Sequence, residues 1–367
     1  MNFRTGDGKH LTFLDEFDKG NLKVFCFYSQ IPLSAWYSRK EQLESYLNSK
    51  IIKIATPPEE FNYIYVYTVT EPLPDMLKWD DEYMLANRNF LSVGFSYEKI
   101  TFIDLGKSPH TFIAGETGSG KSNILKCLIY QCLYKEHEVK LIDFKRGVSF
   151  SDFNEFIEIY SEYDKIIIVL ETLVKETNRR LDLFVKSKVE DIEQYNMTNS
   201  SELKRIVVFI DELAELMRVS DKQANKQIVG SLETLTRISR AVGINLIMGL
   251  QRPDSTIVNG QIKNNVTLRI CGRFVDPEPS RIMLGNDSAT MLSKIKGRFI
   301  LKDDEVTEFQ AFYITSDLMN NLSYIRKYLF GDSELIEMEN DTTPEETVDS
   351  TQEQGANIDF NFDDIQI

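Results

Sequence analysis

The stretch from Gly115 to Ser122 reads GETGSGKS and constrains the fold of this 367-residue chain more than any other feature. It lies between a short apolar run at 111–114 and a helical pattern at 123–134. Glycines in such a loop let successive backbone N–H groups turn toward a phosphate chain, which also meets the positive end of the following helix. The sequence therefore predicts a P-loop in an α/β fold, with a nucleoside triphosphate bound at the end of a strand.

The residue types within this loop predict its ligands. Lys121 is expected to reach the β- and γ-phosphates of ATP and to act in catalysis, and Ser122 to ligate Mg²⁺. The residues expected to line the nucleotide are Gly115, Glu116, Thr117, Gly118, Ser119, Gly120, Lys121, Ser122 and Asn123. The cofactors predicted on these grounds are ATP and Mg²⁺.

A second run, at 205–212, reads RIVVFIDE and has the pattern of a buried parallel strand that ends in two acids. We expect Asp211 to hold the Mg²⁺ shell and Glu212 to orient and deprotonate the attacking water. The alternative is an apolar strand that ends in a solvated acidic turn. The P-loop about ninety residues upstream favours the catalytic interpretation.

Several further motifs resemble one known family. The stretch 239–274 reads SRAVGINLIMGLQRPDSTIVNGQIKNNVTLRICGRF and closely resembles the motor core of the FtsK/SpoIIIE DNA translocases, within the FtsK–HerA group of hexameric ATPases. Other motifs follow in that family's order: PH at 109–110, LIDFK at 141–145, ETNRRL at 176–181, YN at 195–196, DELAELM at 211–217 and GRFI at 297–300. The resemblance implies a RecA-like motor with a mainly parallel sheet, which hydrolyses ATP and encircles double-stranded DNA as a homo-hexamer.

The resemblance also assigns roles to single residues. It implies that Arg240 is the arginine finger, which crosses to the neighbouring subunit's γ-phosphate, and that Gln251 senses phosphate beside the nucleotide. Arg252, Lys263 and Arg281 match pore-loop positions that touch DNA phosphates, a contact that needs positive charge but no base recognition. Without the resemblance, each of these three would be interpreted as a solvated surface charge.

The chain departs from the family pattern at three places. Leu250 precedes Gln251 where a threonine is common, and Pro277 and Pro279 occupy a loop where relatives place a lysine, so DNA contact there rests on Arg281. Phe144 replaces a common proline in LIDFK. The lysine after it, at 145, is expected either on the nucleotide side or at the subunit interface.

Charge and composition divide the chain into three parts. The net charge is −15, yet residues 331–367 hold twelve acids and no lysine or arginine; removing those twelve from 57 leaves 45 acids against 42 bases. We expect a small α+β domain at 1–108, the motor at 109–330 and a disordered acidic tail at 331–367. Within the first part, strands are predicted at 23–28 and 61–70 and a helix at 38–48, with strands at 91–94 and 100–105 leading into the motor.

The tip of the tail, at 357–367, reads NIDFNFDDIQI and interleaves apolar residues with acids. Such a tip resembles the acidic C-terminal peptide by which single-stranded DNA-binding proteins dock onto partner enzymes. We expect it to recruit a DNA-processing partner such as a relaxase. The alternative is that the tip folds back on the motor or only keeps the protein soluble.

The sequence shows no sign of membrane insertion or secretion. No stretch approaches ~18 uncharged apolar residues, and no signal peptide is evident. The four cysteines form no CxxC pair, which fits a reducing compartment. We therefore expect a cytoplasmic protein without an integral membrane segment, with recruitment to a membrane by partners left open.

Taken with the resemblance, these features predict an ATP-driven DNA translocase that acts as a coupling or accessory motor in transfer of a mobile genetic element. Double-stranded DNA is the expected substrate, and single-stranded DNA is the second choice. The alternative is an FtsK-like ATPase of a protein-secretion system, whose cargo is polypeptide; the basic residues at the predicted pore positions argue against it. A third class, a nucleotide-switched adaptor, is disfavoured by Glu212 and Arg240.

Overall fold

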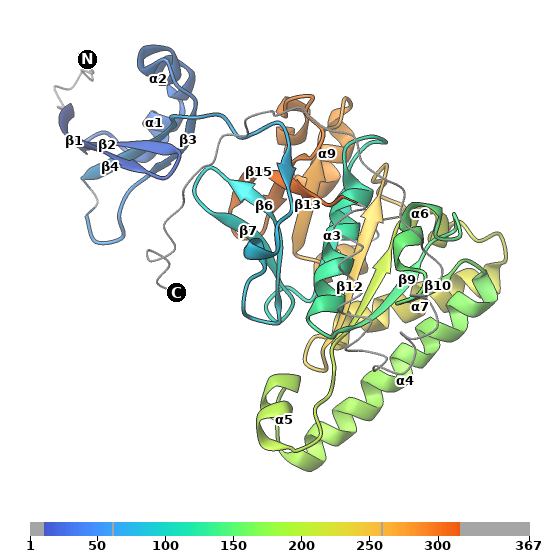
Figure 1. Cartoon of the computed structure of the whole chain (residues 1–367). Helices are drawn as coiled ribbons and strands as arrows, with labels where there is room; N and C mark the ends of the chain where they lie inside the picture. The colour runs from blue at the N-terminus through green and yellow to red at the C-terminus, as the bar shows by residue number, and fades with distance from the viewer. Residues whose placement is uncertain (1–10, 61, 258–259, 316–367) are drawn as a thin grey trace, which may run out of the picture. The chain divides into compact units, whose positions relative to one another are not determined.

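A computed structural model describes residues 11–60, 62–257 and 260–315 of the chain (Figure 1). Its described part contains two sheets, one of four strands and one of eleven. The predicted tail at 331–367, with its apolar tip, lies outside the described residues. Among the helices within these ranges, none is both long and apolar enough to cross a lipid bilayer.

The smaller sheet is antiparallel and carries its own hydrophobic core. Its strand order is β1 (Leu11–Lys19), β2 (Leu22–Ser29), β4 (Tyr63–Val69) and β3 (Ile51–Ala55). Burial alternates strictly along β4, as expected when only one face of a sheet is covered. Trp36 of α1 (Leu33–Tyr37) and Leu43 of α2 (Lys40–Leu47) complete the buried cluster on that face.

The larger sheet has six parallel strands, followed by antiparallel ones. In spatial order these are β10 (Glu158–Tyr160), β9 (Glu138–Ile142), β11 (Ile206–Ile210), β12 (Ile244–Leu250), β8 (His110–Ala114), β13 (Leu268–Gly272), β14 (Arg298–Lys302), β15 (Val306–Tyr313), β6 (Phe90–Ser96) and β7 (Ile100–Asp104), with β5 (Leu77–Lys78) beside β15. This mixed α/β architecture with a mostly parallel sheet is the fold class that the sequence predicted.

Helices connect the parallel strands and cover the sheet. They are α3 (Lys121–Tyr134), α4 (Tyr163–Ser187), α5 (Ile192–Thr198), α6 (Leu213–Met217), α7 (Lys222–Ile238), α8 (Gly260–Asn265) and α9 (Pro277–Leu284), with short 3₁₀ turns at Asp81–Tyr83, Val148–Phe153 and Ser288–Met291. The longest helix, α4, packs against α7 (Figure 1). All residues of β8, β11 and β12 are buried, because helices cover both faces of a parallel sheet. The strands expected at 111–114 and 206–210 are thus confirmed.

Three strands from the first part of the chain, β5, β6 and β7, join the large sheet. β6 pairs with β15 in an antiparallel register, and β7 pairs with β6. These are the strands that the sequence placed at 91–94 and 100–105, within the predicted domain 1–108. By hydrogen bonding, the division between the two sheets falls between β4 and β5, well before residue 108.

Candidate nucleotide-binding site

The P-loop joins the carboxyl end of β8 to the start of α3, as the sequence predicted. Gly118 and Gly120 have φ of +87° and +105°, a backbone conformation that side chains with a Cβ rarely adopt. Gly120 is also the residue that caps α3, so its free conformation sets where the first turn of the helix begins. The loop therefore presents the N-terminus of a fourteen-residue helix to a phosphate group.

Lys121 lies among the two acids of the second motif. Its Nζ donates a hydrogen bond to Asp211 Oδ1 at 3.1 Å and to the Asp211 carbonyl, and it lies 3.8 Å from Glu212 Oε2. The side chains of Lys121 and Asp211 are only 5% and 2% exposed. A buried charge needs a partner of opposite sign. The Lys121 ammonium is that partner for the Asp211 and Glu212 carboxylates, so the three groups lie together at one edge of the sheet.

Glu212 is held at the end of two neighbouring strands. It follows β11 and precedes α6, and the backbone N–H of Gln251, just after β12, donates to Oε2 at 3.0 Å and to Oε1 at 3.3 Å. Burial raises the pKa of Glu212 above its ordinary value, against the opposing effect of Lys121. A carboxylate with a raised pKa is a stronger base for a proton of water.

Lys145 is a further charged residue at this edge. Its Nζ lies 3.6 Å from Asp211 Oδ2, at the same edge of the sheet as Lys121. The signal that could have found it is topological. β9 and β11 are parallel neighbours in which Ile142 lies opposite Ile210, so the residues that follow both strands share one edge.

The remaining residues of the loop lie in two kinds of environment. The Thr117 hydroxyl is 3.4 Å from Gln251 Oε1, which links the loop to the end of β12. Glu116 and Asn123, in contrast, direct their side chains to later parts of the chain. Glu116 Oε1 accepts from the backbone N–H of Val275 at 3.0 Å, and Asn123 Nδ2 donates to the Phe312 carbonyl at 2.6 Å.

The oxygen atoms at this edge suit a magnesium ion. Ser122 stands in the first turn of α3, and the Asp211 carboxylate lies beside the neighbouring Lys121. The buried Ser119 hydroxyl in the same loop has no hydrogen-bond partner. Within the described ranges no cluster of three or more His, Cys, Asp or Glu could form an all-protein metal cage. Mg²⁺ commonly binds through one or two protein oxygens, water and substrate phosphates, and Ser122 and Asp211 carry oxygens of that kind.

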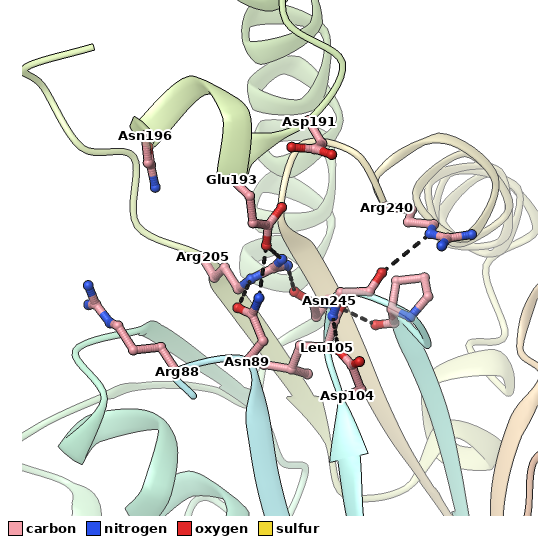
Figure 2. Close-up of polar contacts among 12 residues, drawn as sticks. Arg88, Asn89, Asp104, Leu105, Asp191, Glu193, Asn196, Arg205, Arg240 and Asn245 are labelled. Carbon is pink, nitrogen blue, oxygen red and sulfur yellow. Dashed lines mark hydrogen bonds and ion pairs between the residues drawn. The ribbon is translucent and has the colours of Figure 1, made fainter. Parts of the chain in front are cut away.

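Arg240 lies at the opposite edge of the sheet. It precedes β12, whereas Gln251 follows it, and the seven residues of that strand span about 20 Å. Its exposed guanidinium donates from Nε to the Gly106 carbonyl at 3.3 Å, in the turn between β7 and β8 (Figure 2). Arg240 therefore cannot serve the P-loop of its own subunit.

The three residues predicted to touch DNA are all on elements that follow β12. Arg252 is 81% exposed with Asp276 Oδ2 at 3.6 Å, and Lys263 is on α8. Arg281 on α9 forms a two-pronged pair with Asp287, at 2.6 and 2.9 Å, which raises the pKa of Arg281. Exposed pairs of this kind contribute little to stability, so a nucleic-acid phosphate can replace the carboxylate.

A cavity of about 380 Å³ is lined both by P-loop residues and by Arg252, one of the three residues predicted to touch DNA. Its walls come from the P-loop, the end of β12 and the segment leading into α9. Glu116, Thr117 and Gln251 line it together with Arg252. The nucleotide loop and the first predicted DNA contact thus share one surface.

Residues 76–255 match the FtsK/SpoIIIE family. The chain is 34% identical over 252 residues to the DNA translocase FtsK of Staphylococcus epidermidis, and 34% identical over 278 residues to that of Staphylococcus aureus. These matches cover 59% and 65% of this chain but only 31% and 34% of the relatives. The chain thus spans about a third of the length of the curated relatives that it matches.

Solved structures give longer matches. The pCW3 conjugation coupling protein TcpA, solved in a monomer form with ATPgS, is 39% identical, with a TM-score of 0.68 and coverage of 89% of this chain and 96% of that one. EssC (ATPases 2 and 3) from Geobacillus thermodenitrificans is 17% identical, with a TM-score of 0.61 and coverage of 71% and 53%, a likeness of fold alone. The family match at residues 76–255 contains both the P-loop and the acidic end of β11, and the match with TcpA covers 96% of that chain at 39% identity. The chain therefore belongs to the FtsK/SpoIIIE family.

Proposed function

We propose that this protein is an ATPase that drives DNA translocation, as a coupling or accessory motor in the transfer of a mobile genetic element. The observation that carries the ATPase part is the buried contact of Lys121 with Asp211 and Glu212 at the P-loop. The DNA part is supported by similarity to proteins described as DNA translocase FtsK and as a conjugation coupling protein.

Each residue at the P-loop edge has a task in hydrolysis. The loop's backbone N–H groups and the N-terminus of α3 bind the triphosphate, and Lys121 moves its charge from the acids to the β- and γ-phosphates. Ser122 and Asp211 are the residues that would hold Mg²⁺, which supplies neutralisation of phosphate charge when bound. Glu212 accepts a proton from the attacking water, with its carboxylate oriented by the N–H of Gln251.

Arg240 acts in a neighbouring subunit, in a homo-hexamer. Its position about 20 Å from its own P-loop supports action in trans, since the strand between them is fixed on both sides by β11 and β8. A guanidinium delivered to the γ-phosphate stabilises the charge of the transition state.

DNA is bound by Arg252, Lys263 and Arg281 through its phosphates. Such contacts need no base recognition, so they suit a motor that moves along any sequence. Double-stranded DNA is the proposed substrate, with single-stranded DNA as the second form to test. We place the protein in the cytoplasm, where partners bring it to its site of action.

The tail tip at 357–367 is the proposed contact for a DNA-processing partner such as a relaxase. Deleting these residues is expected to leave ATPase and DNA binding unchanged while abolishing capture of the purified partner. A deletion that alters the basal ATPase rate would instead indicate that the tip acts on its own motor.

One experiment separates DNA transport from protein secretion. The steady-state ATPase rate is measured with no addition, with double-stranded DNA, with single-stranded DNA and with an unfolded polypeptide. Stimulation by double-stranded DNA supports the proposal. Stimulation by polypeptide alone would favour the alternative, an FtsK-like ATPase of a protein-secretion system. An equal rate in all four conditions would contradict both DNA transport and protein secretion.

A further inference from the structure

A buried arginine of α4 donates a hydrogen bond to the backbone of the loop at 239–243, which carries Arg240. Arg180 of α4 is 5% exposed, and its Nη1 donates to the carbonyls of Val242 at 2.9 Å and Lys204 at 3.0 Å. Its Nε donates to Glu176 at 2.7 Å, which compensates the charge. The second arginine of the ETNRRL motif therefore binds the backbone of the loop that carries the proposed arginine finger.

A second buried arginine lies beside the same loop. Arg205, also 5% exposed, donates from Nε to Asn89 Oδ1 at 2.7 Å and from Nη1 to Asn245 Oδ1 at 3.2 Å, and its Nη2 pairs with Glu193 (Figure 2). Asn89 Nδ2 donates to the same Glu193 oxygen at 2.9 Å. The four side chains thus form one closed network at the edge where β11 and β12 begin.

Asn245 extends this network to the acceptor of Arg240. Its Nδ2 donates to the Leu105 carbonyl at 2.8 Å and to the Pro109 carbonyl at 3.0 Å, the two ends of the turn between β7 and β8. The carbonyl of Gly106, inside that turn, is the one that Arg240 contacts. A continuous path of contacts therefore runs from Glu193 through Arg205 and Asn245 to the turn that holds the guanidinium.

The cost of such a network points to a purpose beyond stability. The Arg205 guanidinium is buried whereas the carboxylate of its partner Glu193 is partly exposed, so the desolvation of the arginine offsets much of their attraction. What the network provides here is a fixed position for a turn, and hence for an exposed side chain that would otherwise sample many rotamers. A displacement of about 1 Å in a catalytic contact can lower a rate about 100-fold.

We propose that Glu193, Arg205 and Asn245 are positioning residues for Arg240. They fix the turn at 105–109, so that the guanidinium is presented to a neighbouring subunit's nucleotide in one geometry. This inference rests on the proposed trans action of Arg240.

The test removes the carboxylate at the far end of the path. The Glu193 side chain is 39% exposed and contacts Arg205 and Asn89, outside the proposed nucleotide and DNA sites, so Glu193→Ala is expected to act on Arg240 through the network. The matched control is Glu202→Ala, because the Glu202 carboxylate pairs with Arg88 at 2.7 Å. We expect Glu193→Ala to lower kcat about tenfold with ATP affinity unchanged, Glu193→Gln to restore most of the rate by returning an acceptor, and the control to match wild type.

A double variant distinguishes positioning from a general structural effect. If Glu193 acts through Arg240, adding Glu193→Ala to Arg240→Ala causes no further loss of turnover. A further tenfold loss in the double variant, or wild-type turnover in Glu193→Ala, would overturn the inference. Thermal unfolding checks that each variant folds. If Glu193→Ala does not fold, Asn89→Ala, which removes a hydrogen-bond acceptor but no charge, takes its place in the test.

The same set separates this inference from the proposed function. Wild-type turnover in Arg240→Ala would reject the arginine finger itself. A strong loss in Arg240→Ala with none in Glu193→Ala would retain the finger and reject its positioning.

Discussion

The ammonium of Lys121 lies 3.1 Å from Asp211 Oδ1, with both side chains almost fully buried. The lysine proposed to bind the triphosphate is thus also the cation that compensates the buried Asp211 and the partly buried Glu212. Function and stability are joined in this one contact.

Lys121→Ala is therefore expected to abolish ATP hydrolysis and also to destabilise the fold. Removing one partner of a buried pair typically costs about 3–5 kcal/mol, and we expect the lower end because Lys145 remains beside Asp211. Turnover and denaturant unfolding of the same preparation measure the two effects. Hydrolysis near the wild-type rate would exclude Lys121 from the phosphate site.

Glu212→Gln should retain ATP binding and lose turnover, because only the group that accepts the water proton is removed. Burial raises the pKa of Glu212 in the nucleotide-free protein, and a base works only when deprotonated, so wild-type kcat/KM for ATP is expected to fall as pH drops through this raised pKa. The acidic limb should therefore lie above the range of a free glutamate. A pH profile of kcat/KM measures it, and appreciable turnover in the glutamine variant would remove Glu212 from the role of base.

Arg240→Ala is expected to leave ATP binding intact and to lower turnover on the order of 10³-fold. If Arg240 serves a neighbour, mixing this variant with Lys121→Ala should create interfaces with one intact P-loop and one intact arginine. The mixture is then expected to turn over ATP faster than either variant alone. Activity of the mixture equal to the sum of its separate parts would argue against action in trans.

Neutralising Arg252, Lys263 and Arg281 together should remove stimulation of the ATPase by DNA and spare the basal rate. Each lost phosphate contact is also expected to reduce the dependence of log affinity on log salt by about 0.9 for double-stranded DNA. Titrations at several salt concentrations measure both. An unchanged affinity and slope would place the DNA contacts elsewhere on the protein.

The sequence predicted the parts of the site that depend on local pattern. The glycine spacing of the P-loop and the acids after the apolar run at 206–210 both lie where expected, at one edge of the parallel sheet. Such features are set by neighbours in the chain, so they leave a readable signal. The resemblance added the remote residues, and the structure places Arg240 at the start of β12, at the end of the strand away from its own P-loop.

Side-chain direction was beyond what the pattern could show. Glu116 lies in the P-loop motif and Asn123 directly after it, and nothing in that pattern indicates that their side chains contact the backbone at 275 and 312. These contacts join segments more than 150 residues apart, and no local periodicity reports them. The same holds for β6 and β7, whose place in the large sheet depends on pairing with the distant β15.

The length of β12 fixes the distance between the residues at its two ends. Gln251, beside the acids at the P-loop, and Arg240, the residue proposed to serve a neighbour, lie at its two ends. Because ladders on both sides lock its register, the strand cannot slip or stretch by one residue without turning its side chains to the wrong face. In a closed ring, each subunit would then act as a rigid spacer between consecutive nucleotides, and the geometry of the whole circle would depend on the length of one buried strand.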